Sequence, residues 1–181
     1  MNNKELIYTR RSTRNYTDQE IDQNTLDNIF FLTQYAPSWK NSQIVSYRVI
    51  KDKKLKETIA DKAVHDFVYN SNVIKECPLI VVQVIKKGIS GKHHDEYITD
   101  RLDKWEMYDA GISAQTLCLS AWSYGVSSLI MGIVDGEVLR LLLDLNDDEY
   151  VGSIICLGYT NDKNIKAPKR KDMSEFVQYV K

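Results

Sequence analysis

The sequence predicts one α+β domain of three layers. Segments with the spacing of amphipathic helices alternate along the chain with short apolar runs that are typical of strands. Neither an internal repeat nor a low-complexity linker divides the 181 residues, so one domain is expected over residues 1–181, with a C-terminal arm over about 161–181. Hydrophobic residues make up 43% and charged residues 27% of the chain, which is typical of a globular protein with a substantial core.

Helical spacing of apolar residues predicts helices at 22–35, 53–64, 67–74, 105–124 and 136–143. Dense or alternating apolar residues predict strands at 45–51, 78–85, 126–133 and 153–159. The run at 78–85 is apolar almost throughout, which predicts a strand that is buried on both faces. Small residues occur on nearly every side of helix 105–124, which places that helix at the centre of the fold. Residues 86–97 are polar and contain two glycines, so they are predicted to form a mobile loop.

Composition excludes several classes of function. The formal net charge of −1 gives no general attraction to nucleic acid or to an anionic membrane. No apolar run is long enough to cross a bilayer, and none near Met1 resembles a secretory signal, so a cytoplasmic protein is expected. The three cysteines lie far apart among apolar neighbours, which predicts buried free thiols. No metal site is predicted, because the adjacent His93 and His94 lie in a polar stretch that reads as a solvated loop.

Three arginines within five residues form the first motif that could carry chemistry. Arg10, Arg11 and Arg14 enclose the hydroxyls of Ser12 and Thr13, and such a group can hold a phosphate and neutralise its charge. A solvated basic terminus would show the same composition, and charge alone leaves both interpretations open.

Two further segments are candidate ligand contacts. Residues 37–43 lie between a predicted helix and a buried strand, where Ser38, Asn41 and Gln43 offer donors and acceptors after Pro37. The basic stretch around Lys169 and Arg170 could form a second arm of a phosphate clamp. Taken singly, an ordinary helix-ending turn and a solvated charged tail are the favoured interpretations of these two segments.

The absence of common nucleotide-binding and hydrolase motifs narrows the kinds of site that the sequence supports. The chain has no G-x-G-x-x-G after a strand and no G-x-x-x-x-G-K-[ST], so neither a Rossmann site nor a P-loop is supported. It also lacks the G-x-S-x-G nucleophile elbow, and three histidines leave little room for a histidine-based hydrolase.

In combination and order, the motifs resemble the FMN-dependent nitroreductases. The resemblance runs from R-R-S-x-R through P-S-x-x-N-x-Q to the basic C-terminal stretch, and it includes the pattern Ala-Gln-x-Leu-x-Leu-x-Ala that begins at Ala114. It implies a three-layer fold with a mostly antiparallel central sheet between helices, and an intertwined homodimer that shares two flavin sites. It also implies that FMN is the cofactor and that NADH or NADPH is the electron donor.

By this resemblance, Arg10, Ser12 and Arg14 hold the FMN phosphate and the pyrimidine edge of the flavin, with Arg11 inside the same motif. Ser38 and Asn41, with Pro37 and Gln43 around them, approach the cofactor from the other subunit. The remaining positions implied to contact FMN are Asn70 at the pyrimidine, Ile130, Met131 and Gly132 along the ring, and Lys169 and Arg170 at the phosphate.

The chain departs from the family pattern at two places. Trp39 stands where family members often have Ser or Gly, and Ile44-Val45 replaces a common Pro-Trp. Trp39 could narrow the acceptor pocket, or it could pack at the interface of the dimer. Neither departure changes the residues that are implied to contact the flavin.

The implied function is electron transfer from NAD(P)H to a small organic acceptor, such as a nitroaromatic or a quinone, by a ping-pong mechanism. FMN carries the redox chemistry, so no catalytic side chain is predicted, and Arg14 is expected to stabilise negative charge at N1 and O2 of the flavin. Two alternatives remain: a flavin-binding carrier or sensor without rapid turnover, and a flavin-free basic adaptor. The sequence carries no pattern that selects NADH over NADPH or identifies the acceptor.

Overall fold

A four-stranded antiparallel sheet forms the middle of the molecule, with its strands in the order β1-β2-β6-β5. The computed structural model describes residues 2–162 and 165–180. The sheet strands are β1 (Val45–Ile50), β2 (Leu79–Lys86), β5 (Ser127–Met131) and β6 (Glu149–Gly158). The helices are α1 (Asn3–Thr9), α2 (Gln23–Thr33), α3 (Lys53–Lys62), α4 (Val68–Glu76), α5 (Lys104–Ser123), α6 (Gly136–Leu142) and α7 (Met173–Phe176). A 3₁₀ turn, η1 (Trp39–Asn41), and a hairpin of β3 (Lys92–His93) and β4 (Glu96–Tyr97) complete the list.

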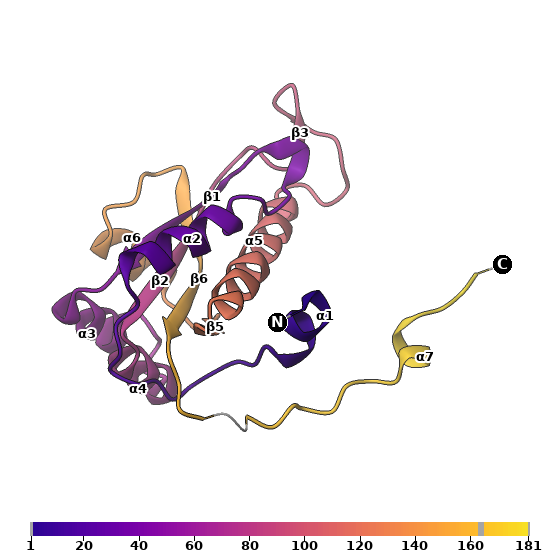
Figure 1. Cartoon of the computed structure of the whole chain (residues 1–181). Helices are drawn as coiled ribbons and strands as arrows, with labels where there is room; N and C mark the ends of the chain where they lie inside the picture. Colours follow the sequence, from indigo (N-terminus) through magenta and orange to yellow (C-terminus); the bar gives the residue numbers. More distant parts are fainter. Residues whose placement is uncertain (1, 163–164, 181) are drawn as a thin grey trace.

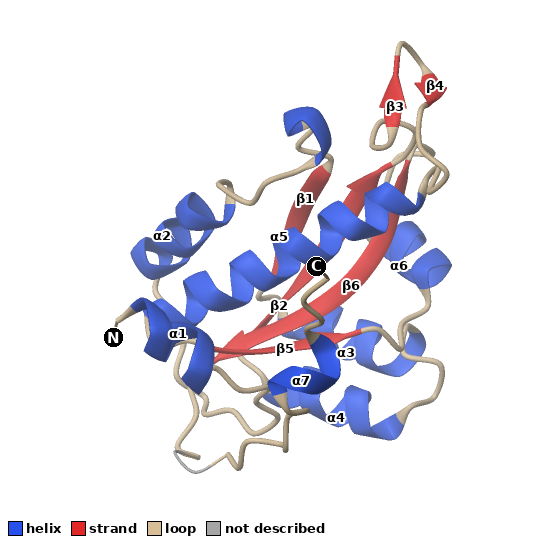
Figure 2. Ribbon diagram, turned by 90° about the vertical axis from the view of Figure 1, so that its right-hand side faces the viewer, coloured by secondary structure: helices blue, strands red, loops and turns tan. Residues whose placement is uncertain are grey.

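Helices cover both faces of this sheet (Figure 1). α2 and α5 lie on one face, where Val81 packs with Leu117 and Ala121 of α5. α3, α4 and α6 cover the other face, where Ile80 and Val82 of the same strand join a second apolar cluster. Figure 2 shows α5 crossing the sheet lengthwise, with α3, α4 and α6 on the far side. The predicted three-layer arrangement and the burial of residues 79–85 on both faces are therefore confirmed.

The segment 86–97, which was predicted to be a mobile loop, contains a short hairpin that the sequence did not predict. β3 and β4 pair within it, with Lys92 opposite Tyr97 and His93 opposite Glu96. The two turn residues, His94 and Asp95, have φ angles of 49° and 66°, and a two-residue turn with both φ angles positive suits the twist of a hairpin. This hairpin turn could not be recognised in the sequence, because His94-Asp95 stands where such turns usually have Asn-Gly.

Two further elements differ from the prediction. α1 forms within the N-terminal segment for which no helix was predicted, because the side chain of Asn2 accepts hydrogen bonds from the backbone of Lys4 and Glu5 while the carboxylate of Glu5 accepts one from the backbone of Asn2. β6 begins at Glu149 and not at residue 153, since it continues to pair with β2 beyond a bulge at Gln83.

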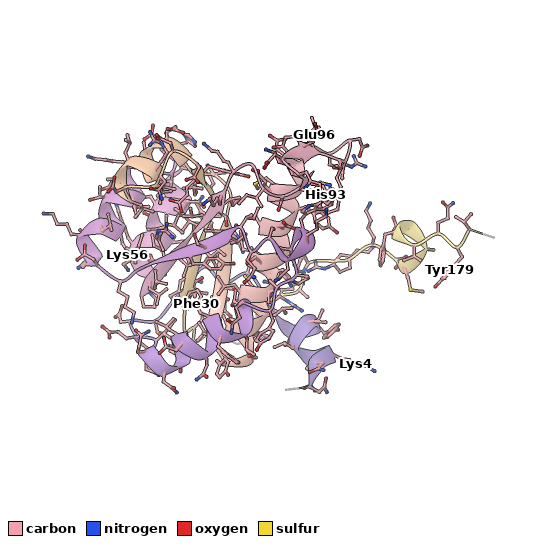
Figure 3. The ribbon with its side chains drawn as sticks, turned by 90° about the horizontal axis from the view of Figure 1, so that it is seen from above. Lys4, Phe30, Lys56, His93, Glu96 and Tyr179 are labelled. Carbon is pink, nitrogen blue, oxygen red and sulfur yellow. The ribbon has the colours of Figure 1, made fainter. Side chains whose placement is uncertain are left out.

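The C-terminal segment extends away from the sheet (Figure 1). It contains the short helix α7, and Figure 3 shows Tyr179 well separated from the body of the molecule. Met173, Phe176 and Tyr179 are 63%, 68% and 83% exposed, respectively, so this arm buries little of its apolar surface against its own chain. Over residues 2–162 and 165–180, no helix is both long enough and apolar enough to span a bilayer.

Candidate functional site

The arginine motif is attached to the edge of the sheet. Ser12 forms an isolated parallel bridge with Ser128 of β5, and the backbone N–H of Thr13 donates to the Ser128 carbonyl at 3.0 Å. Thr13 is 1% exposed, and its own carbonyl accepts a hydrogen bond from the hydroxyl of Tyr16 at 2.8 Å. Burial raises the pKa of Tyr16 far above its ordinary value, so this hydroxyl stays protonated and keeps donating. A motif that could have been a solvated terminus is therefore fixed in place.

The side chains of Arg11 and Arg14 lie at two different cavities of the structure. Arg11 turns back, and its guanidinium donates to the carbonyls of Tyr8 and Arg10 at 2.8 and 2.7 Å. It lines a cavity of about 250 Å³ with Thr13, Trp122 and Ser127. Arg14 is exposed on a different cleft. No carboxylate within the described part of the chain forms an ion pair with Arg10, Arg11 or Arg14, so their charges are available to an anion.

The cleft beside Arg14 has a volume of about 310 Å³ and joins three distant segments of the chain. The motif contributes Arg14, α4 contributes Asn70, and β5 with the residues after it contributes Ile130, Met131 and Gly132. Asn70 is 7% exposed, and its amide nitrogen donates to the carbonyl of Ile133 at 3.3 Å, which ties α4 to the end of β5. Five positions implied by the resemblance to contact FMN thus meet at one place.

The residues of this cleft fit a flavin. An isoalloxazine ring is flat and largely apolar with one polar edge, and the cleft offers apolar side chains beside one cation and one amide. Apart from Gly132 and its two chain neighbours, no atom of the described residues lies within 4 Å of the point where a Cβ on Gly132 would sit, so the backbone there faces open space along which a flat ring can lie.

Sequence reasoning missed two aromatic residues of this cleft. Phe67 and Tyr69 closely precede Asn70 in the chain and line the same space, with 41% and 51% of their surfaces exposed. Their ring centroids lie 6.1 Å apart. Apolar spacing alone placed this segment in a helix, but two aromatic residues next to an asparagine were an available sign of a binding wall.

Residues 37–43 form a second part of the candidate site. Pro37, Ser38 and Gln43 line a groove of about 210 Å³ together with Asp109 and Ser113 of α5. Asn41 lies in the 3₁₀ turn of the same loop and is exposed. Within one chain, this groove and the Arg14 cleft have no lining residue in common.

The same loop is joined to the β3–β4 hairpin. The indole nitrogen of Trp39 donates to the carbonyl of Lys92 at 3.0 Å, and its ring lies 5.0 Å from that of Trp105. Lys40 Nζ lies 2.7 Å from Nδ1 of His93, which is labelled on the hairpin in Figure 3.

The predicted basic clamp lies apart from both of these sites. Lys169 and Arg170 are exposed on the extended arm, where the guanidinium of Arg170 donates to the carbonyl of Pro168 at 3.0 Å. The arm runs away from the sheet in Figure 1, and neither residue lines the Arg14 cleft within one chain.

Comparison with known proteins places these features in a family. The model of the nitroreductase family matches residues 7–159. The chain belongs to the nitroreductase family. This membership confirms the family, the α+β fold and the class of oxidoreductase that the sequence predicted.

Two solved structures of the family share this architecture. A nitroreductase family protein from Clostridium novyi NT is 24% identical, with a TM-score of 0.78 over 92% of this chain and 89% of that one. A second, from Streptococcus pneumoniae TIGR4, is 19% identical, with a TM-score of 0.82 over 97% of this chain and 98% of that one. Among relatives by sequence, the FMN reductase [NAD(P)H] of Bacillus subtilis (strain 168) is 28% identical over 169 residues. The match covers 88% of this chain and 66% of the relative.

Proposed function

We propose that this nitroreductase transfers electrons from NAD(P)H to a small organic acceptor, such as a nitroaromatic or a quinone, by a ping-pong mechanism on FMN held in the Arg14 cleft. The observation that carries the proposal is the meeting of Arg14, Asn70 and residues 130–132 in one cleft. FMN as cofactor and NAD(P)H as donor, both predicted from the resemblance, are confirmed by the family and by its FMN reductase member.

The residues of the cleft would bind and orient the cofactor. When bound, FMN supplies hydride transfer, and the protein determines its orientation and its electrostatic surroundings. Arg14 would face the pyrimidine edge, where a cation stabilises negative charge, and Arg10 and Ser12 would hold the phosphate. The open side of the cleft would admit the donor and then the acceptor in turn, which is the physical basis for the ping-pong mechanism.

The active unit in this proposal is a homodimer. Pro37, Ser38, Asn41 and Gln43 would complete the flavin site of the partner, as would Lys169 and Arg170 on its arm. Exposed apolar surface supports a partner: Met107 and Tyr108 on α5 are 51% and 62% exposed. Outside the adjacent turns of α5 itself, no atom of the described residues lies within 4 Å of a Cβ placed on Gly111. Such a surface suits an isologous contact between two copies of α5.

An absorption spectrum of the purified protein tests this function. A yellow protein with flavin bands that bleach under anaerobic NADH or NADPH, and recover on addition of a quinone or a nitroaromatic, is the expected result. A colourless protein that takes up no added FMN would contradict the proposal. Flavin that binds but is not reduced by either nicotinamide would instead indicate a carrier or sensor.

A further inference from the structure

The carboxyl group of Asp109 is buried in the N-terminal half of α5, with 2% of the residue exposed. Its two oxygens accept the backbone N–H of Trp39 at 3.0 and 3.1 Å. Its Oδ2 also accepts the hydroxyl of Ser90 at 2.5 Å and that of Ser42 at 3.4 Å. A buried polar group of this kind is costly unless it is hydrogen-bonded, and here one group joins three segments of the chain.

The loop that Asp109 holds has a strained backbone. Lys40, Asn41 and Gln43 have φ angles of 45°, 56° and 49°, in the left-handed region that residues other than glycine rarely adopt. Such a conformation persists only where the surroundings impose it. Asp109 accepts hydrogen bonds from the loop at Trp39, just before the strained residues, and at Ser42, which lies among them. The hydroxyl oxygen of Ser38 accepts the backbone N–H of Gln43 at 3.0 Å.

The same carboxyl group also fixes the start of the β3–β4 hairpin. Ser90 is fully buried and precedes Gly91, whose φ is 85°. A Cβ at Gly91 would lie 2.5 Å from the carbonyl oxygen of Leu102, so a side chain at this position would clash with the backbone and only glycine fits. Asp109 therefore sets the positions of the loop and of the hairpin relative to one helix.

We propose that Asp109 is a positioning residue for flavin binding: it imposes the strained backbone that presents Ser38 and Asn41 to the cofactor. This inference rests on the proposed function, in which those two residues contact FMN in the partner subunit. Asp109 acts through the loop, and the cost of the left-handed turn is offset by the hydrogen bonds that the carboxyl group accepts.

The test is an FMN titration of the apo-protein, followed by flavin fluorescence, for wild type and Asp109→Asn. The amide keeps the size of the side chain but has one acceptor oxygen in place of two and cannot accept from all three donors as the carboxyl group does, so the dissociation constant for FMN is expected to rise about tenfold or more. Hydrogen exchange of residues 39–43 should become faster in the variant apo-protein, while exchange of β2 stays unchanged.

A second substitution separates positioning from a general structural role. Glycine adopts the left-handed conformation without strain, so Lys40→Gly in the Asp109→Asn background should recover affinity by about threefold. Lys40→Ala removes the same side chain and keeps the strain, so it should recover nothing. If Asp109→Asn does not fold, the same comparison of glycine with alanine is made in the Ser42→Ala background.

The outcomes distinguish the two proposals. A wild-type protein that binds no FMN contradicts the proposed function. A wild-type protein that binds FMN no more tightly than Asp109→Asn, or than Ser42→Ala where that background is used, overturns the role of Asp109. Equal effects of Lys40→Gly and Lys40→Ala overturn it as well, because the carboxyl group would then act on the core and not on the loop.

Discussion

The backbone N–H of Thr13 donates to the carbonyl of Ser128 at 3.0 Å. This hydrogen bond attaches the arginine motif to β5, the strand that also carries Ile130 and Met131 into the candidate flavin cleft. Arg14 and the residues proposed to lie along the flavin ring are therefore both held by β5. Any change that loosens the attachment of the arginine motif to this strand is expected to weaken flavin binding.

Arg14→Ala is expected to weaken FMN binding and slow its reduction by NAD(P)H. A lost hydrogen bond to a charged group corresponds to about 1.5–3 kcal/mol, or roughly a 10- to 150-fold higher dissociation constant. Arg101→Ala is the matched control, because Arg101 is exposed and its nearest acidic partner, Asp100, lies 3.7 Å away on the surface. The assignment is wrong if the double variant Arg10→Ala, Arg14→Ala binds FMN as tightly as wild type.

Tyr16→Phe is expected to destabilise the protein in a way that depends on pH. Burial, as the largest cause, raises the pKa of Tyr16 in the folded state above its ordinary value of 10.0. A raised pKa means that the stabilisation is complete below pH 10 and is lost as the pH rises further. The free energy of unfolding should therefore differ from wild type by about 1 kcal/mol at neutral pH, and the difference should shrink above pH 10.

Urea unfolding on both sides of pH 10 measures this effect. Tyr35→Phe serves as the control, since Tyr35 is 69% exposed. A Tyr16→Phe difference that does not change with pH would show that the hydroxyl is not held protonated by burial.

Residues 86–97 are expected to exchange their amide hydrogens faster than β2, although they contain a hairpin. The hairpin strands are two residues long and lie outside the main sheet, so they open at little cost. Trp39→Phe should accelerate exchange there, because it removes the hydrogen bond to Lys92. Trp122→Phe, which removes a hydrogen bond to Thr9 instead, should not. Uniform protection across the hairpin and β2 would refute the prediction.

The holo-protein is expected to be a homodimer by light scattering, with a buried interface on the order of 2,000 Å² or more. Phe176→Asp places a charge on the exposed apolar arm and should shift the protein toward monomer, with loss of FMN from the shared sites. Glu175→Gln, a neighbouring substitution on the same short helix, should leave the dimer intact. A monomer that keeps its flavin and oxidises NAD(P)H would eliminate both the dimer and the shared site.

Local patterns were sufficient to predict the sheet strands and most of the helices that pack on them. Residues 79–85 could be assigned because burial on both faces leaves a continuous apolar run, and residues 53–62 because one face of the helix is apolar. The hairpin could not be predicted, since its turn uses His94 and Asp95 in place of the residues that normally mark such turns.

The candidate site was predictable only where its residues form motifs. Arg14 and Gly132 belong to recognisable segments, and the structure brings them to one cleft. Asp109 was visible only as part of a helical pattern, because its role depends on Trp39 and Ser90, which are distant in sequence. A carboxyl group among small and apolar helical residues was nevertheless a sign that polar partners would have to come from elsewhere in the fold.

The exposed C-terminal arm has a consequence for the lifetime of the protein. Residues 165–180 extend from the body with Met173, Phe176 and Tyr179 uncovered, and an unattached segment of this kind is readily cut by proteases. In the proposed homodimer a partner would cover the arm, so subunits that find a partner would persist while single subunits are degraded. The half-life of the protein would then rise with its own concentration, and surplus unpaired chains would be cleared.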